Sequence, residues 1–378
     1  MTVMIVLGLA ATACSSPSTP SNPGTPGTPG ATPVPGSFLW QLRGTKQVAS
    51  TVPANGDVNP YGVALVRVSG GRLTAGDILV SNFNDKADVQ GTGTTIVEVS
   101  PAGTARVFAS LSTMPPGQAC PGGIGLTTAL GILPGGWVVA GSLPTTSGGT
   151  LPSLDPAGCL IVLNDQGTVA ETISNRDIAG PWDLAVSSAG TSAALFVSNA
   201  LGGDITTHDG ISVTGNCTVV RLDLALRASA PPKLIGSTVI GTGFPWRASK
   251  KELILAPTGL ALDGSGTLYV DDTLTDGVSA IPHALTRTSA VTALGSTLSA
   301  GGALHGPLGM TLAPNGDLIV VNGDDGNAVE ITPAGKQLAA RTLIENGAGE
   351  LFGIIMAQAG RGILIVNDGT DALDELRS

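Results

Sequence analysis

The stretch that decides the fold is "GPLGMTLAPNGDLIVVNGDDGNAVEITPAGKQ" (residues 306–337). It contains two apolar runs and one half-apolar run, which are separated by Pro-Asn-Gly-Asp and by Gly-Asp-Asp-Gly-Asn. Short runs rich in Val, Ile and Leu, bounded by Gly, Asn, Asp and Pro, are typical of β-strands joined by tight turns. One such stretch predicts only three short strands, so the architecture depends on whether the pattern recurs.

The pattern recurs along the chain, and each unit has a first, a second and a third run. The first runs are residues 59–66, 122–130, 180–187, 256–263, 306–313 and 350–357. The second runs are 76–84, 135–142, 193–200, 266–273, 316–323 and 362–369, and the third are 94–109, 159–173, 217–226, 278–285, 328–341 and 371–377. A repeat of roughly 40 to 60 residues with several strands per unit indicates a β-propeller. We therefore predict an all-β, six-bladed β-propeller whose blades bury one another's faces.

The segment "FLWQLRGTKQVAST" (residues 38–51) precedes the first unit, whereas the last unit ends after its third run. We predict that this segment supplies the outer strand of the last blade. Such a closure leaves no free sheet edge and ties the two ends of the propeller together. The alternative is an unpaired leader.

The composition bounds the class of protein. The chain has 378 residues, of which 54 are Gly and 26 are Pro, and only 12% are charged. It is too apolar for a disordered protein and too rich in Gly for a helical one. The net charge of −10 and the lack of a Lys/Arg face exclude nucleic acid as a partner. No apolar run is long enough for a transmembrane helix.

Residues 1–36 differ from the rest. "MTVMIVLGLAATAC" (1–14) is apolar, and 15–36 is an uncharged stretch of Pro, Gly, Ser and Thr that suits an extended tether. The first part resembles a bacterial lipoprotein export signal with the lipobox Ala11-Thr12-Ala13-Cys14, although no Lys or Arg precedes Arg43 and Ala11 replaces the usual Leu. The resemblance implies cleavage and lipidation at Cys14; an ordinary signal peptide is the alternative.

These observations divide the chain into a signal peptide (1–14), a tether (15–36) and the propeller (37–378). We expect an exported protein that is lipid-anchored in the bacterial cell envelope and touches the membrane only through the lipid. Ser15 after the lipidated cysteine resembles the sorting signal for the outer membrane, on its periplasmic side.

Three cysteines remain for an oxidising compartment, where disulfides persist. Cys120 precedes a first strand and Cys159 begins the third strand of the same blade, so both lie at the same face of the propeller. We therefore predict a Cys120–Cys159 disulfide. Cys217, which begins the third strand of the next blade, is the competing partner.

The repeat resembles known propeller families. Pro-x-Gly, an apolar run, an Asp/Asn-Gly turn and a run ending in Asn or Asp, as in "APTGLALDGSGTLYVDDT" (256–273), resemble the NHL-repeat propellers. More distantly they resemble the gluconolactonase / senescence-marker lactonases. The resemblance spans about residues 38–378. It implies the fold and leaves the activity open, since these folds host many functions.

The topology predicts where a ligand site would lie. In each blade the first strand begins, and the second ends, at the same mouth of the central channel. The residues just before the repeated Gly include three aromatics, Tyr61, Trp182 and Phe352, and the second strands end in Asn82, Asn199, Asp272, Asn322 and Asn367. A concave cup with convergent polar groups is the default ligand site. The alternatives are turn capping for each Asn and a packed channel plug for the aromatics.

Loops should form a rim at this mouth. We expect loops at 83–93, 143–158 and 200–216, joined by "GTGFPWRASKKE" (241–252), which carries Trp246, Arg247, Lys250 and Lys251. This is the densest positive cluster in the chain and would suit an anionic or sugar-like ligand; the alternative is a solvated loop.

The lactonase resemblance implies a divalent metal held partly by a Glu near the start of a first strand, and this chain has no Glu there. Asp272 and Asn199 are the candidate metal ligands, for a hard cation such as Ca²⁺. His208, His283 and His305 fall at unlike repeat positions, and no HExxH, G-x-S-x-G or Walker motif occurs.

We identify no other cofactor and predict a non-catalytic module that binds a small molecule, carbohydrate or protein at the channel mouth. The alternatives are a metal-assisted, lactonase-like hydrolase or lyase, and an interaction protein that uses its blade edges.

Overall fold

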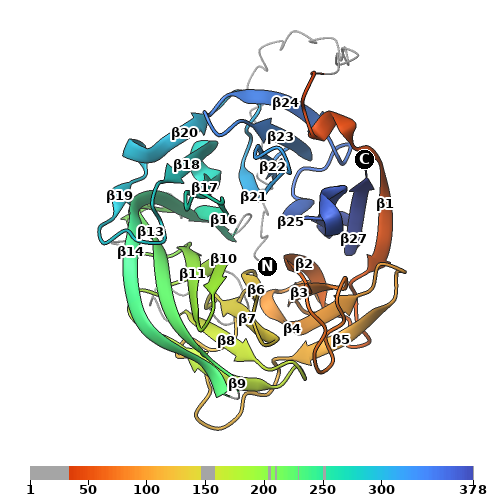
Figure 1. The fold of residues 1–378 in the computed structure, drawn as a ribbon, viewed down its shortest axis with the longest axis vertical. Helices are drawn as coiled ribbons and strands as arrows, with labels where there is room; N and C mark the ends of the chain where they lie inside the picture. Colours follow the sequence, from red (N-terminus) through yellow and green to blue (C-terminus); the bar gives the residue numbers. More distant parts are fainter. Residues whose placement is uncertain are drawn as a thin grey trace, which may run out of the picture. The chain divides into compact units, whose positions relative to one another are not determined.

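The computed structural model describes residues 34–145, 158–202, 206–208, 211–228, 230–249 and 253–377. These residues form six sheets around a central axis (Figure 1), all antiparallel apart from one short parallel strand pair, which confirms the predicted all-β, six-bladed propeller. The helical segments of the described residues are single 3₁₀ turns: η1 (Leu39–Gln41), η2 (Thr273–Thr275), η3 (Leu294–Ser296), η4 (Gln358–Gly360) and η5 (Asp368–Thr370). None of these turns has the length or the apolar character to cross a membrane.

Four blades follow the expected pattern of consecutive strands. Blade 1 contains β2 (Val58–Leu65), β3 (Ile78–Asn84), β4 (Gln90–Val99) and β5 (Ala105–Ser110), and blade 2 contains β6 (Leu130–Leu133), β7 (Trp137–Ser142), β8 (Cys159–Leu163) and β9 (Val169–Ile173). Blade 4 contains β16 (Pro257–Leu262), β17 (Leu268–Asp272), β18 (Gly277–Ile281) and β20 (Thr297–Ala300), and blade 5 contains β21 (Pro307–Leu312), β22 (Leu318–Asn322), β23 (Asn327–Ile331) and β24 (Gln337–Thr342). In each, the first strand lies innermost.

Blade 6 is completed by the N-terminal strand, as predicted. Its strand order is β1 (Arg43–Ser50), β27 (Ala372–Arg377), β26 (Gly362–Asn367) and β25 (Leu351–Met356). Figure 1 shows the red β1 beside the dark blue β27. The two strands pair antiparallel from Arg43–Arg377 to Ser50–Ala372, so the ring has no open seam there.

The segment before β1 is held by a buried carboxylate. Glu330 of β23 is fully buried and accepts hydrogen bonds from the Ser37 hydroxyl and from the backbone N–H groups of Phe38 and Leu39. The Arg341 guanidinium donates to two further carbonyl oxygens of the segment. The N-terminal segment is therefore attached to blade 5 before it enters blade 6.

Blade 3 corrects two of the loop predictions. It contains β10 (Pro181–Ala189), β11 (Ser192–Asn199), β13 (Ile211–Arg227), β14 (Ala230–Ser249) and β15 (Leu253–Leu255), with β12 (Thr206–His208) and β19 (Val291–Thr292) at its margins. Residues 211–216 and 241–249, which we expected to be loops, therefore belong to one long hairpin. Register shifts between β13 and β14 accommodate its Gly residues without ending the pairing.

The hairpin also contains part of the segment in which we expected a positively charged loop. Trp246 is buried and its indole N–H donates to the Gly202 carbonyl, so it is part of the core and not of a rim loop. Lys250 and Lys251 lie outside the described residues, as do the expected signal peptide with Cys14 and nearly all of the tether.

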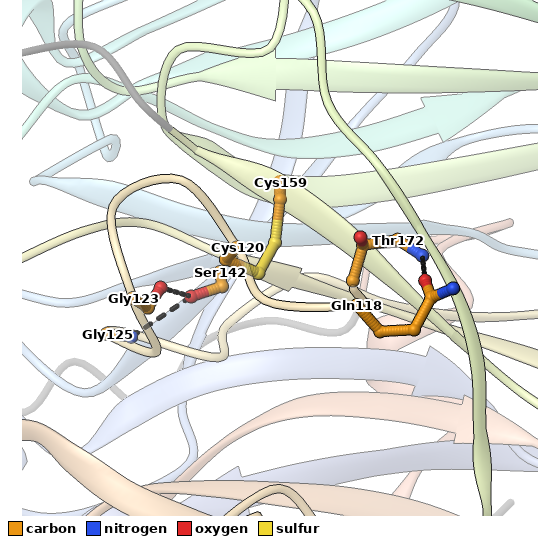
Figure 2. The surroundings of a disulfide bond; sticks show 7 residues. All are labelled: Gln118, Cys120, Gly123, Gly125, Ser142, Cys159 and Thr172. Atoms are coloured by element: carbon orange, nitrogen blue, oxygen red, sulfur yellow. Dashed lines mark hydrogen bonds between the residues drawn. A yellow bond between two sulfur atoms is a disulfide. The ribbon is translucent and has the colours of Figure 1, made fainter. Parts of the chain in front are cut away.

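Blade 2 starts later than predicted, because side-chain bonds replace strand pairing at the beginning of its first run. The run expected at 122–130 pairs only through the isolated bridge Leu126–Leu143, and β6 begins at Leu130. The Ser142 hydroxyl accepts from the Gly125 N–H and donates to the Gly123 carbonyl (Figure 2).

In blade 4, the third strand is shorter than the run expected at 278–285. His283 lies in a turn after β18, with φ 56°, and not within a strand.

A disulfide joins Cys120 to Cys159, with 5.6 Å between the Cα atoms (Figure 2). It attaches the segment before blade 2 to β8, and the Gln118 carboxamide beside it accepts the Thr172 N–H of β9. Cys217 is a buried free thiol.

Removing this disulfide should lower stability. The bridge closes a loop with a sequence separation of 39, so the double variant Cys120→Ser/Cys159→Ser is expected to lose about 4 kcal/mol of unfolding free energy. Urea unfolding of the oxidised protein and of this variant measures the difference. Cys217→Ser, which leaves the disulfide intact, should lose less unfolding free energy. An equal loss would contradict the prediction that the disulfide contributes most among the cysteines.

Candidate functional site

The central channel is surrounded by the first strand of each blade and has two ends. These strands are β2, β6, β10, β16, β21 and β25. We call the end where these strands begin the entry face, and the end where they turn into the second strands the hairpin face. The ligand site expected from the sequence lies at the entry face.

The expected aromatic residues meet at the channel axis and close it. Tyr61 stacks on Phe352 with 4.9 Å between ring centroids, and it meets Trp182 edge-on at 5.4 Å. The Trp182 indole N–H donates to the Tyr61 hydroxyl oxygen at 2.6 Å, and Phe83 packs against Tyr61. Because these rings come from blades 1, 3 and 6, they form a plug across the channel; Tyr61 and Trp182 are only 5% and 6% exposed.

The expected asparagines make hydrogen bonds within their own blades at the entry face. The carboxamide nitrogens of Asn82, Asn199 and Asn322 donate to the carbonyls of Thr51, Asp177 and Ala303, which lie in the segments that lead into their own blades. Asn367 donates to the Asp374 carboxylate. All four side chains are buried. Their contacts are those of the turn-capping alternative, and a ligand role for them stays a prediction.

The two candidate metal ligands differ in what they can offer. The Asn199 side-chain oxygen already accepts the N–H groups of Ala179 and Gly180. Asp272 keeps one buried oxygen without a partner, and burial raises the pKa of this carboxyl to about 6. Among the described residues, no group of three or more His, Cys, Asp or Glu side chains is arranged to hold a metal ion. A metal-binding role for Asn199 and Asp272 stays a prediction.

An open cavity lies on the other side of the plug. It has a volume of about 290 Å³ and is lined by all six blades, with Tyr61 and Asp183 at its inner end. A wider hollow of about 720 Å³ at the hairpin face shares the lining residues Arg67, Thr311, Ile355 and Met356 with it. The channel is thus closed by the plug toward the entry face and open toward the hairpin face.

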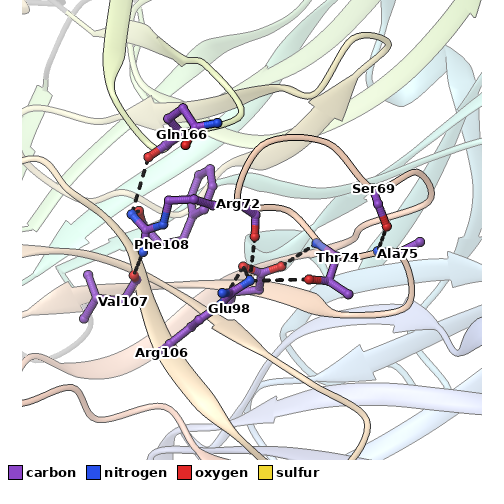
Figure 3. A network of polar contacts seen from close by, with 9 residues as sticks. All are labelled: Ser69, Arg72, Thr74, Ala75, Glu98, Arg106, Val107, Phe108 and Gln166. Carbon is purple, nitrogen blue, oxygen red and sulfur yellow. Dashed lines mark hydrogen bonds and ion pairs between the residues drawn. The ribbon is translucent and has the colours of Figure 1, made fainter.

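The rim of this opening is firmly held in blade 1. The loop between β2 and β3 carries Arg72, whose guanidinium donates to the carbonyls of Val107, Phe108 and Gln166, the last of which lies in blade 2 (Figure 3). The Arg106 guanidinium donates to the Arg72 carbonyl and pairs with the buried Glu98 carboxylate. These contacts tie the loop between β2 and β3 to β5 and to blade 2.

Two carboxyl groups that we did not predict lie near the inner end of the cavity: Asp183, which is half-buried and lines it, and Asp271, which is buried. Asp183 accepts the backbone N–H groups of Leu184 and Leu260, and burial raises its pKa to about 7. Asp271 is fully buried, and neither of its oxygens has a hydrogen-bond partner. Burial, together with the nearby charges of Asp183 and Asp272, raises the pKa of Asp271 well above its ordinary value.

The repeat itself contains the signal for both residues. Asp183 occupies the position of the repeated Gly, as in Gly259 of "APTGLALD". Asp271 occupies the position of Ser81 and Ser198. This position lies one residue before the Asn or Asp that ends the second strand. Each of those serine hydroxyls accepts an N–H of its own blade and donates to a carbonyl of the next blade in the chain. Asp271 makes neither of these hydrogen bonds, so it differs from its counterparts.

The raised pKa values predict a protein that is more stable in mild acid. Asp183 and Asp368 both have pKa values raised from 3.8 to about 7, so the folded state binds protons more tightly than the unfolded state. The stability that they contribute is complete below about pH 4 and is lost as the pH rises to about 7. Urea unfolding should show a loss on the order of 2 kcal/mol between pH 5.5 and pH 8. Asp183→Asn should flatten this profile; a stability that rises with pH over this range would contradict the prediction.

Comparison with solved structures finds other β-propellers of similar fold. The chain is similar to a gluconolactonase from Xanthomonas campestris, with 14% identity, 89% of each chain covered and a TM-score of 0.53. It is also similar to the PQQ-bound aldose sugar dehydrogenase from Streptomyces coelicolor, with 14% identity, 88% of this chain and 98% of the other covered and a TM-score of 0.51. These similarities confirm the expected likeness to gluconolactonase-type propellers in fold.

A third similar structure is virginiamycin B lyase from Staphylococcus aureus with quinupristin, at 11% identity, with 89% of this chain and 99% of the other covered and a TM-score of 0.50. No protein-family model matches the chain, and no curated protein matches it in sequence. Identities this low show the fold alone, so the site must be argued from the residues of this chain.

Proposed function

We propose that this propeller is a non-catalytic binding module that takes a small polar molecule into its central channel from the hairpin face. The observation that carries the proposal is the cavity of about 290 Å³ beneath the aromatic plug. Tyr61, which we expected to contact a ligand, lines this cavity and belongs to the plug at the same time.

The size and the lining of the cavity favour a small molecule over a protein segment. Its volume lies near the lower end of the roughly 300 to 1,000 Å³ that is usual for ligand pockets. Arg67 and Asp183 provide a cationic and an anionic group, and first-strand residues such as Leu260 and Ile354 provide apolar contacts. A sugar or another small polar compound would fit this chemistry.

A variant that obstructs the channel tests the proposal. Thr311 lines both the cavity and the outer hollow, so Thr311→Trp should block entry. Thr342→Trp, on the exposed outer strand β24, is the matched control. Compounds from a library of sugars, amino acids and organic acids that raise the melting temperature of the protein should lose this effect in Thr311→Trp and keep it in the control. Hits that survive Thr311→Trp would overturn channel binding.

A metal-assisted, lactonase-like hydrolase or lyase is the second candidate, and the structural similarity to the Xanthomonas gluconolactonase favours it. The experiment is elemental analysis of the purified protein, with melting temperatures measured in EDTA and in Ca²⁺. One tightly bound metal ion per chain that is lost in Asp272→Ala would support this candidate and justify a lactone and ester screen. The absence of bound metal and of any shift would overturn it.

We also propose that the protein acts outside the cytoplasm, held by a lipid on Cys14. The Cys120–Cys159 disulfide supports this location, because disulfides persist in oxidising compartments. In bacteria that express the full chain, Cys14→Ser should move the protein from the detergent phase to the aqueous phase of a detergent partition. An unchanged distribution would contradict the lipid anchor.

A further inference from the structure

The inner end of the channel cavity contains more carboxylate oxygen than the protein itself satisfies. Asp271 has no hydrogen-bond partner for either oxygen, and Asp183 has only backbone N–H partners. Within the described parts of the chain, no salt bridge involves either residue. The buried Asp271 carboxyl group, which has no hydrogen-bond donor, is costly to ionise unless a positive charge lies near it, and the residues that line this end of the cavity supply none.

Local packing keeps the Asp271 carboxyl close to the channel wall. It projects from the second strand of blade 4 toward the first strand, where Gly259 leaves room for it. A Cβ atom on Gly259 would lie 2.5 Å from an Asp271 oxygen and 2.8 Å from the Cα of Gly309 in the next blade. Since Gly309 lines the cavity, the carboxyl lies directly behind the cavity wall, between the first strands of blades 4 and 5.

The other polar groups near this end do not supply the missing charge. The Tyr61 hydroxyl already accepts the Trp182 indole N–H. Arg67 lines the same cavity, but it follows the end of β2, on the hairpin-face side, whereas Tyr61 and Asp183 lie at the inner end. The cavity therefore has an anionic inner end and a cationic outer end.

We infer that the inner end of the cavity receives the ammonium group of a small organic cation, which donates to the Asp183 carboxylate at the cavity surface, while Asp271 behind the wall adds a second negative charge. This inference rests on the proposed function and names the chemical class of its ligand. An ammonium group supplies N–H donors for Asp183 and the positive charge that both carboxyl groups lack. The volume of about 290 Å³ leaves room for a short carbon chain beyond the ammonium group.

The probe for this inference is n-butylammonium, with n-butanol as the neutral molecule of the same shape and KCl as the source of a bare cation. Calorimetry and melting temperature should show saturable binding of n-butylammonium and none of n-butanol. Asp183→Asn and Asp271→Ser should each weaken this binding about tenfold. Asp271→Ser installs the residue that blades 1 and 3 carry at this position, so the variant is expected to fold. Glu345→Gln, on an exposed side chain, is the matched control.

Three results would overturn the inference: equal binding of n-butylammonium and n-butanol, undiminished n-butylammonium binding in both Asp variants, or saturation by K⁺ alone, which would assign the site to an alkali ion. Failure of the proposed function looks different. If neutral compounds bind and are lost in Thr311→Trp, the channel binds ligands and only the ammonium inference is wrong. If no compound is sensitive to Thr311→Trp, the channel proposal itself is wrong.

Discussion

Replacing Glu330 with alanine is expected to lower the unfolding free energy by about 3 kcal/mol, because one buried carboxylate accepts several hydrogen bonds from the N-terminal segment. The variant leaves the Ser37 hydroxyl and the N–H groups of Phe38 and Leu39 buried without an acceptor. Phe38 and Leu39 themselves are buried against blades 5 and 6, so the damage extends to the packing that closes the ring.

Urea unfolding of Glu330→Ala and of Glu345→Ala measures this contribution. Glu345 lies in the same blade-5 region but is exposed, so its loss should change the unfolding free energy by less than about 0.5 kcal/mol. Limited proteolysis should also release the N-terminal segment of Glu330→Ala first, because that segment loses its attachment to blade 5. Equal stability of the two variants would show that the carboxylate does not hold the segment.

Trp182→Ala is expected to be the most destabilising single change at the channel, by about 3 to 5 kcal/mol, because it removes a buried aromatic ring and leaves a cavity. It also removes the N–H that the Tyr61 hydroxyl accepts. With the plug broken, the cavity should become reachable from the entry face as well as from the hairpin face.

Tyr61→Phe separates the hydrogen bond from the packing. It keeps the ring and leaves the Trp182 N–H without its acceptor, so it should lose only about 1 to 2 kcal/mol. The measurement is urea unfolding of both variants, with ligand binding followed in a Trp182→Ala/Thr311→Trp double variant. Binding restored by the broken plug would confirm that the plug closes the channel. A loss for Trp182→Ala no larger than that for Tyr61→Phe would contradict a packed plug.

Much of the fold could be predicted from the sequence because the repeat is local. The Pro-x-Gly start, the Asn/Asp-Gly turn and the apolar run recur, so six blades follow. The segment at 38–51 was expected to complete the unfinished last blade, and it does. The second and third blades differ from the predicted strand boundaries. A side-chain hydrogen bond replaces strand pairing in blade 2, and a continuous hairpin replaces predicted loops in blade 3. The Ser142 hydroxyl substitutes for strand pairing before β6, and β13 and β14 pair through Gly residues that elsewhere mark turns.

The candidate site was harder to predict. The repeat shows which residues lie near the channel, but not which end of the channel is open. Tyr61, Trp182 and Phe352 were found from their shared position in the repeat. The sequence did not show that their rings contact one another and so fill the channel instead of lining it. Asp183 and Asp271 were missed because each looked like an ordinary polar residue. Comparison with Gly259 and with Ser81 and Ser198 at the same repeat positions would have marked both as exceptions.

The pairing of β1 with β27 also sets the order of events in folding. The partners Arg43 and Arg377 stand at opposite ends of the propeller sequence, so the last sheet is complete only when both ends are present. Contacts between residues so distant in sequence form slowly, because a very long loop must close first. A chain still emerging from the ribosome therefore has an open ring with the inner strands of blade 6 missing. If the protein is exported as proposed, the ring cannot close before the C-terminal strand has been made.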